Sequence, residues 1–177
     1  MGTGSESVPT YLCSCCGKEH GGLPFSFAAD FPDPFANLSH DQREARAHIS
    51  SDQCIIDQEQ FYLRGCLEIP IQGTDQVFLW GLWASIWEKD FDEISDHWNS
   101  DGRELKIGPY KARLANSLSL FPESFNMPIT IRIRPVGERP LFLVDDDKHP
   151  LGVEQSKGIP LQKAEEYVCL LLRMATP

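Results

Sequence analysis

Two runs rich in aromatic and β-branched residues, 61–71 and 77–87, restrict the folds open to this chain. In the first run apolar residues alternate with polar ones such as Arg64 and Glu68, which is the period of two expected of a half-buried strand. The second run is apolar on both faces, so it should lie centrally in a sheet, with cover on two sides. A short polar segment containing glycine separates the runs, and together they predict a long β-hairpin.

The second run also holds Trp80, Trp83 and Trp87. Each of these side chains can bury on the order of 200 Å² of surface, so a hydrophobic core is the simplest use for them. The alternative is an aromatic floor beneath a ligand. For that alternative the sequence offers a candidate pocket made of Trp80, Trp83, Arg64 and His149.

The rest of the chain alternates between helical and strand periodicity. Ser39 and Gln42 form a capping box, which predicts a short helix in this part of the chain. The other predicted elements are helices at 88–99 and 161–174 and strands at 127–134 and 141–144. These elements predict an α+β fold: an antiparallel sheet with a central tryptophan-rich hairpin and two or three helices packed on it.

The length of 177 residues fits one domain, which can bury about 70% of its unfolded surface. A composition with 41% hydrophobic and 24% charged residues is that of an ordinary globular protein. Residues 1–10 are expected to form a flexible lead. Residues 11–177 are expected to form a single α+β domain, and its first part, 11–22, resembles a zinc knuckle.

The chain is acidic, with 26 acidic against 16 basic residues and a net charge of −10. This charge argues against nucleic acid as a partner, because such binding depends on basic patches. It favours either simple solubility or a basic protein partner. No apolar run approaches the ~20 residues that span a bilayer, and the N-terminus lacks the pattern of a signal peptide. We therefore expect a cytoplasmic protein without a membrane partner.

Three cysteines lie within four residues near the N-terminus. Cys13 and Cys16, followed by Gly17, have the spacing of a zinc knuckle, in which two thiolates face one ion. Structural zinc takes four ligands, and the best candidates for the other two are His20 and Cys54. The prediction is a structural zinc ion held by Cys13, Cys16, His20 and Cys54.

Three other states compete for Cys13 and Cys16. A disulfide is disfavoured because no export signal is evident. A thioredoxin-like redox pair needs a helix at the motif, which Gly17 and the glycines after it oppose. Reduced thiols without a metal are the remaining alternative, because half of a zinc signature is only a moderate signal.

The acidic segment 145–150 contains three aspartates before Lys148 and His149. It lacks the spacing of a calcium loop, so it is predicted to be a solvated turn, with His149 as a partner for a pocket or for zinc. Signatures of serine hydrolases, phosphate-binding loops and metalloproteases are missing. A zinc-dependent hydrolase remains an alternative, with an open metal position near Cys13, Cys16 and His20 and with Glu19 as the base.

Several short motifs resemble an uncharacterised bacterial family, the domain of unknown function 2199. The residues that carry the likeness are Cys13-x-x-Cys16-Gly17 with His20, Cys54, the segment 64–71, Trp80-Gly-Leu-Trp83, Arg139-Pro140, and the segment 147–151 with Gly158-Ile159. The resemblance implies a bacterial single-domain protein and brings no activity, substrate or catalytic residue with it. The preferred hypothesis is a non-enzymatic, zinc-stabilised binding or adaptor protein with an acidic surface.

Overall fold

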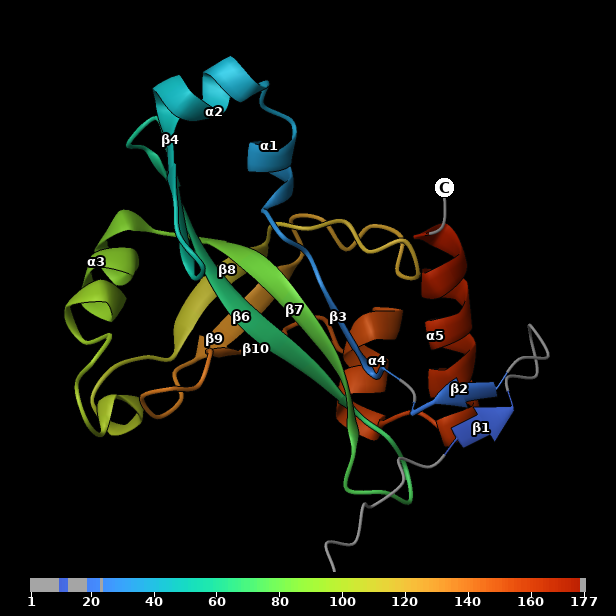
Figure 1. Ribbon diagram of the computed structural model, residues 1–177. Helices are drawn as coiled ribbons and strands as arrows, with labels where there is room; N and C mark the ends of the chain where they lie inside the picture. The colour runs from blue at the N-terminus through green and yellow to red at the C-terminus, as the bar shows by residue number, and fades with distance from the viewer. Residues whose placement is uncertain (1–9, 13–18, 23, 176–177) are drawn as a thin grey trace, which may run out of the picture.

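The long hairpin predicted from the sequence is the centre of the fold (Figure 1). The computed structural model describes residues 10–12, 19–22 and 24–175. Strand β6 (Gln60–Pro70) pairs antiparallel with β7 (Val77–Ile86) along nearly its whole length. Both predicted strands are therefore confirmed, and their ends differ from the expected ones by a single residue.

Five strands close into a barrel, a closure that the predicted antiparallel sheet did not include. From β7 the chain continues through β8 (Tyr110–Leu114), β9 (Pro128–Arg132) and β10 (Leu141–Val144), each antiparallel to the strand before it. β10 then returns to β6, where Leu141 pairs with Cys66 in parallel orientation. This last pairing closes the ring and gives the sheet an enclosed inner face.

Gly65 makes the closure sterically possible. A Cβ atom at this position would overlap the ring of Phe142, which packs against the glycine from β10. Phe142 is completely buried, so its ring has no free space into which it can move. The glycine that interrupts the first strand is thus explained by the close approach of an aromatic ring.

The edge of β6 that pairs with β10 is shared by a second strand. β5 (Gln53–Ile56) pairs antiparallel with the first half of β6, and β4 (Ala47–Ile49) pairs with β5. β5 and β10 both begin beside the middle of β6 and run away from it in opposite directions. The loops that precede these two strands meet at this junction, which positions the candidate site.

The remaining strands are short. β3 (Ser26–Ala28) pairs in parallel with the first half of β7, where β8 no longer reaches. β1 (Thr10–Leu12) and β2 (Glu19–Gly21) pair antiparallel and form a separate two-stranded sheet. The segment 13–18, which connects them, lies outside the described residues.

Both faces of the central hairpin are buried, as its sequence predicted. The inner face carries Phe78, Trp80 and Leu82 into the main core. The outer face carries Trp83, which packs in a second cluster with Phe35, Cys54, Ile56, Tyr62 and Ala115. The hairpin therefore separates two apolar layers.

Helices cover the ends of the barrel, with α3 at one end and α4 and α5 at the other (Figure 1). The helices of the described residues are α1 (Asp33–Ala36), α2 (His40–Arg46), α3 (Glu88–Asp96), α4 (Pro150–Lys157) and α5 (Leu161–Met174), with a 3₁₀ turn η1 (Arg103–Leu105). α2 begins at the predicted capping box, and α5 has the predicted bounds. None of the helices in the described part of the chain is both long and apolar enough to cross a bilayer.

Helix α4 was not predicted. The acidic turn expected at 145–150 ends in Pro150, the first residue of the helix, where proline is well tolerated. His149 caps it, because its Nδ1 accepts a hydrogen bond from the Leu151 amide at 3.2 Å. Its Nε2 lies 3.1 Å from the carbonyl oxygen of Pro122, so both ring nitrogens of His149 serve the fold.

Candidate functional site

The structure divides the pocket that was predicted from the tryptophans. Trp80 and Trp83 are buried on opposite faces of β7, in different clusters. His149 caps α4 and is not part of either cluster. Arg64 and Trp83 are the two predicted pocket residues that lie together, because they are paired across β6 and β7.

Arg64 and Trp83 share one acceptor. The carbonyl oxygen of Ala29 accepts a hydrogen bond from Arg64 at 3.3 Å and one from the Trp83 indole at 3.2 Å. The guanidinium carbon of Arg64 lies 5.7 Å from the centre of the Trp83 ring, within range of a cation–π interaction. The Nε atom of Arg64 is buried and has no hydrogen-bond partner among the described residues. Arg64 therefore reaches the edge of the second cluster without a carboxylate bonded to it.

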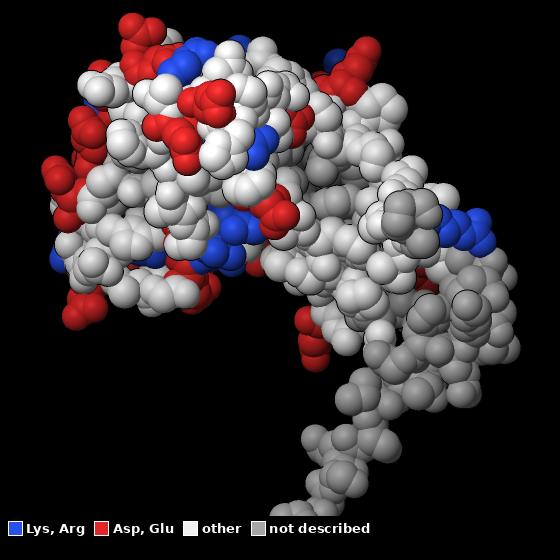
Figure 2. All heavy atoms as spheres, turned by 45° about the horizontal axis from the view of Figure 1, so that its top comes forward, with Lys and Arg blue, Asp and Glu red and all other residues white. Residues whose placement is uncertain are grey.

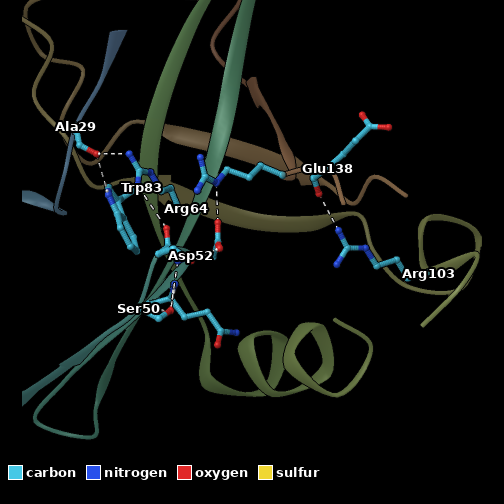
Figure 3. A network of polar contacts seen from close by, with 10 residues as sticks. Ala29, Ser50, Asp52, Arg64, Trp83, Arg103 and Glu138 are labelled. Atoms are coloured by element: carbon cyan, nitrogen blue, oxygen red, sulfur yellow. Dashed lines mark hydrogen bonds and ion pairs between the residues drawn. The ribbon is translucent and has the colours of Figure 1, made fainter. Parts of the chain in front are cut away.

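Asp52 and Arg139 mark the junction of the strands. Asp52 directly precedes β5, and Arg139 lies shortly before β10. Arg139 donates from Nε to Asp52 Oδ1 at 2.6 Å, and the Asp52 carbonyl accepts from the Arg64 amide at 2.8 Å. In Figure 3 Asp52 lies at the middle of the network, with Arg64 and Trp83 on one side and Glu138 and Arg103 on the other.

Arg103 is a buried cation that is held by carbonyl groups. Its side chain donates to the carbonyl oxygens of Trp98, Arg134, Pro135 and Glu138, at distances between 2.5 and 3.2 Å. Its guanidinium also lies 4.9 Å from the centre of the Trp98 ring. Arg103 is only 3% exposed, and its hydrogen bonds include no carboxylate. It pins the loop that leads from β9 to β10 against the end of α3.

A fourth arginine completes the cluster. Arg134 pairs with Glu68 of β6 at 2.5 Å, and the Glu138 carboxylate lies 4.0 Å from it. Cys66 is half-buried on β6. Burial raises the pKa of its thiol, although the nearby guanidinium groups of Arg134, Arg139 and Arg64 act to lower it. Four arginines thus face three carboxylates on this side of β6.

The cluster borders a groove of about 410 Å³, which we call the arginine groove. Its lining residues are Asp52, Trp98, Asn99, Arg103, Val136, Gly137, Glu138 and Arg139. Figure 2 shows basic side chains gathered in a recess of the surface, while acidic side chains are spread around it. Two of the four arginines, Arg103 and Arg139, line the groove, together with the carboxylates of Asp52 and Glu138.

The charges of the groove stabilise one another. Partial burial acts to raise the pKa of Asp52, but hydrogen bonds from Ser51 and Arg139 and the nearby positive charges lower it below its ordinary value. Asp52 consequently stays ionised at neutral pH and holds Arg139 by a single contact at Nε. The two terminal nitrogens of Arg139 make no hydrogen bond with any residue that the structure describes. This free end has the forked geometry that binds a carboxylate or a phosphate.

Cys54, which was predicted as a zinc ligand, is buried in the second cluster. It is 0% exposed, and burial raises the pKa of its thiol to about 12, whereas zinc needs a thiolate. β4, the partner of β5, lies on the side of the molecule opposite to β2 in Figure 1. The structure therefore does not bring Cys54 and His20 together.

The other predicted ligands lie in or beside the segment 13–18. Cys13 and Cys16 are outside the described residues, and His20 lies on β2 opposite Tyr11 of β1. Within the described ranges, no group of three or more His, Cys, Asp or Glu side chains is arranged to hold a metal ion. A site that combines Cys13, Cys16 and His20 stays a prediction.

The zinc hypothesis has a direct test. Purified protein is expected to contain about one zinc ion per chain, because two thiolates at this spacing bind zinc tightly. Replacing both Cys13 and Cys16 by serine should remove the metal, whereas Cys54→Ser should leave it bound. Elemental analysis under reducing conditions measures both results. Metal-free wild-type protein would contradict the hypothesis.

Three residues of the arginine groove were not predicted as site residues from the sequence: Asp52, Arg103 and Arg139. The available signal was weak, because none of the three belongs to a recognisable catalytic or binding motif. Arg139 precedes a proline just before a predicted strand, which marks the start of that strand and says nothing about its neighbours.

Comparisons with known proteins identify a family. Searches of the curated proteins and of the solved structures found no significant match. The sequence profile of a family described as uncharacterised proteins conserved in bacteria matches residues 12–159, and this range includes the barrel and every residue of the arginine groove. The chain therefore belongs to this bacterial family, the domain of unknown function 2199.

Proposed function

We propose that this protein is a non-enzymatic binding protein whose ligand presents an anionic group to Arg139 in the arginine groove. The observation that carries the proposal is the free forked end of Arg139, which Asp52 holds from behind. A guanidinium that is fixed before the ligand arrives loses less freedom on binding, and this increases affinity. The two arginines of the lining are balanced by Asp52 and Glu138, so the free fork of Arg139, and not a net positive charge, selects the anion.

The size and lining of the groove restrict the ligand. A volume of about 410 Å³ is at the lower end of the range for small-molecule sites. Trp98 and Val136 give it an apolar wall, while Asn99 and Glu138 add polar groups near the rim. The groove therefore fits a small carboxylate- or phosphate-bearing molecule, or the end of a peptide chain, with an apolar part beside the charge.

The chemistry of the lining favours binding over catalysis. Arginine stays protonated at all physiological pH values, so it does not serve as a general base. The carboxylate of Asp52 is engaged by Ser51 and Arg139. Burial keeps the thiol of the adjacent Cys66 protonated, which lowers its nucleophilicity. No histidine is among the described residues that line the groove.

Binding can be measured with simple probes. We expect a short peptide with a free C-terminal carboxylate to shift the amide resonances of 134–140, and its C-terminal amide to have little effect. Inorganic phosphate, added to the protein in the same experiment, tests whether the groove binds a phosphate group instead of a carboxylate. Arg139→Gln should weaken binding of the active probe at least about tenfold, because the hydrogen bonds lost are made to a charged group.

Arg46 provides a matched control for Arg139. Its side chain is 42% exposed and pairs with Asp57, compared with 41% for Arg139, but its Nε and a terminal nitrogen are both used in that pair. Arg46→Gln should leave probe binding unchanged. The double change Arg139→Gln with Asp52→Asn separates loss of binding from the effect of an unpaired carboxylate. Equal binding of all variants would refute the proposal, and so would a peptide acid that binds no better than its amide together with phosphate that does not bind.

A further inference from the structure

Trp87 is the tryptophan of the central run that does not enter either core. It is 71% exposed and lies on the lining of a groove of about 540 Å³. The apolar part of this lining includes Phe61, Ile86 and Ala112. A large aromatic side chain that stays exposed beside an apolar groove is typical of an interaction surface. We call this region the Trp87 surface.

The groove exists because β7 and β8 separate. They pair at only two positions, Ala84 with Leu114 and Ser85 with Arg113, and β7 then ends at Ile86. Ala115 donates its amide to the Trp83 carbonyl at 2.8 Å, so the backbone groups of every second residue of β8 point toward β7. Arg113 follows in this series and pairs with Ser85. Lys111 comes after it, and its backbone groups point past the end of β7. The groove thus offers a strand edge to an extended segment.

The basic side chains of the groove are already engaged. Lys111 donates to Thr130 at 2.8 Å and to Asp145 at 2.9 Å. Arg113 donates to the carbonyl oxygen of Asn126 at 2.9 Å. The lining also includes Glu59 and Asp145, which balance these two cations, so the charge that selects a partner comes from the surroundings of the groove.

The helix that starts at Trp87 supplies that charge. Glu88, Asp92 and Asp96 follow one another at intervals of four residues on α3, and all three are exposed. Like charges at this spacing destabilise a helix. None of the three side chains makes an ion pair or hydrogen bond with any residue of the described ranges. This acidic row begins beside the exposed indole ring.

We propose that the Trp87 surface binds an extended, arginine-bearing segment of a partner protein. A guanidinium stacked on the Trp87 indole reaches the Glu88 carboxylate next to it, and this combines a cation–π contact with an ion pair. Further basic residues of the segment face Asp92 and Asp96. The apolar groove and the Lys111 backbone hold the part of the segment that continues beyond the arginine.

Peptides of matched length test this surface. We expect an arginine-rich peptide to bind more tightly than its lysine equivalent, and a glutamate-rich peptide not to bind, with shifts of the Trp87 indole resonance in ¹⁵N-labelled protein. Trp87→Ala should weaken binding of the arginine peptide about threefold to tenfold. The triple variant E88Q/D92N/D96N should weaken it and reduce its dependence on salt.

A second triple variant controls for net charge. D41N/E44Q/D75N removes the same charge from exposed positions of α2 and of the β6–β7 turn. It should leave binding almost unchanged. If it weakens binding as much as the α3 variant, or if arginine and lysine peptides bind alike and Trp87→Ala has no effect, the proposal is wrong. Neither outcome bears on the arginine groove, which lies elsewhere on the barrel.

Discussion

Replacing Gly65 by alanine is expected to lower the free energy of unfolding by about 3 kcal/mol. The added Cβ would overlap the Phe142 ring, and that ring is completely buried. To relieve the overlap, β10 must move away from β6, which opens the barrel at its parallel pairing. Equilibrium unfolding in urea measures the change through the midpoint of the transition.

The partner residue gives the control for Gly65. Phe142→Leu removes the part of the side chain that the alanine would meet, at the cost of a cavity. The double variant should therefore be more stable than the sum of the two single effects predicts, by roughly 1 kcal/mol or more. Strict additivity would show that Gly65 is needed for another reason.

Arg103→Met is expected to cost about 3 kcal/mol or more of unfolding free energy. The change keeps an unbranched side chain but leaves four carbonyl groups without their shared donor in a buried position. Hydrogen exchange at 134–140 should accelerate, because the loop loses its attachment to α3. Probe binding in the arginine groove should weaken as well, since this loop carries Arg139.

Arg132 is the matched control for Arg103. It is exposed on β9, and its side chain makes no hydrogen bond or ion pair with any residue in the described ranges. Arg132→Met should change stability by less than about 0.5 kcal/mol. The free energy of unfolding of Arg103→Lys should lie between those of wild type and Arg103→Met. The lysine ammonium group reaches fewer of the four carbonyl groups than the planar guanidinium does. A fully stable Arg103→Met protein would contradict this account.

Local periodicity was enough to predict much of the secondary structure. The hairpin, the capping box of α2 and the bounds of α5 all depend on residues close together in the sequence. The closure of the barrel depends on a single parallel contact between Leu141 and Cys66, which no local pattern encodes. Helix α4 was missed because the aspartates before it dominated the interpretation of the segment, although Pro150 is a recognised start signal.

The site shows the same division between local and distant information. Arg64 and Trp83 were predicted as pocket residues because they lie on the hairpin itself. Trp80 was assigned to the same pocket although its position, three residues from Trp83, places it on the other face of the strand. Asp52 and Arg139 meet only after β5 and β10 have both taken their places on β6, so their pairing follows from the complete fold.

The shared edge of β6 has a consequence for any molecule that reaches Arg139. Asp52 directly precedes β5, which lies outside the barrel, whereas Arg139 leads into the strand that closes it. An anion bound at the terminal nitrogens of Arg139 leaves its Nε contact with Asp52 in place, and that contact joins the outer β4–β5 hairpin to the barrel. Occupancy of the groove and attachment of that hairpin are therefore thermodynamically linked, each favouring the other.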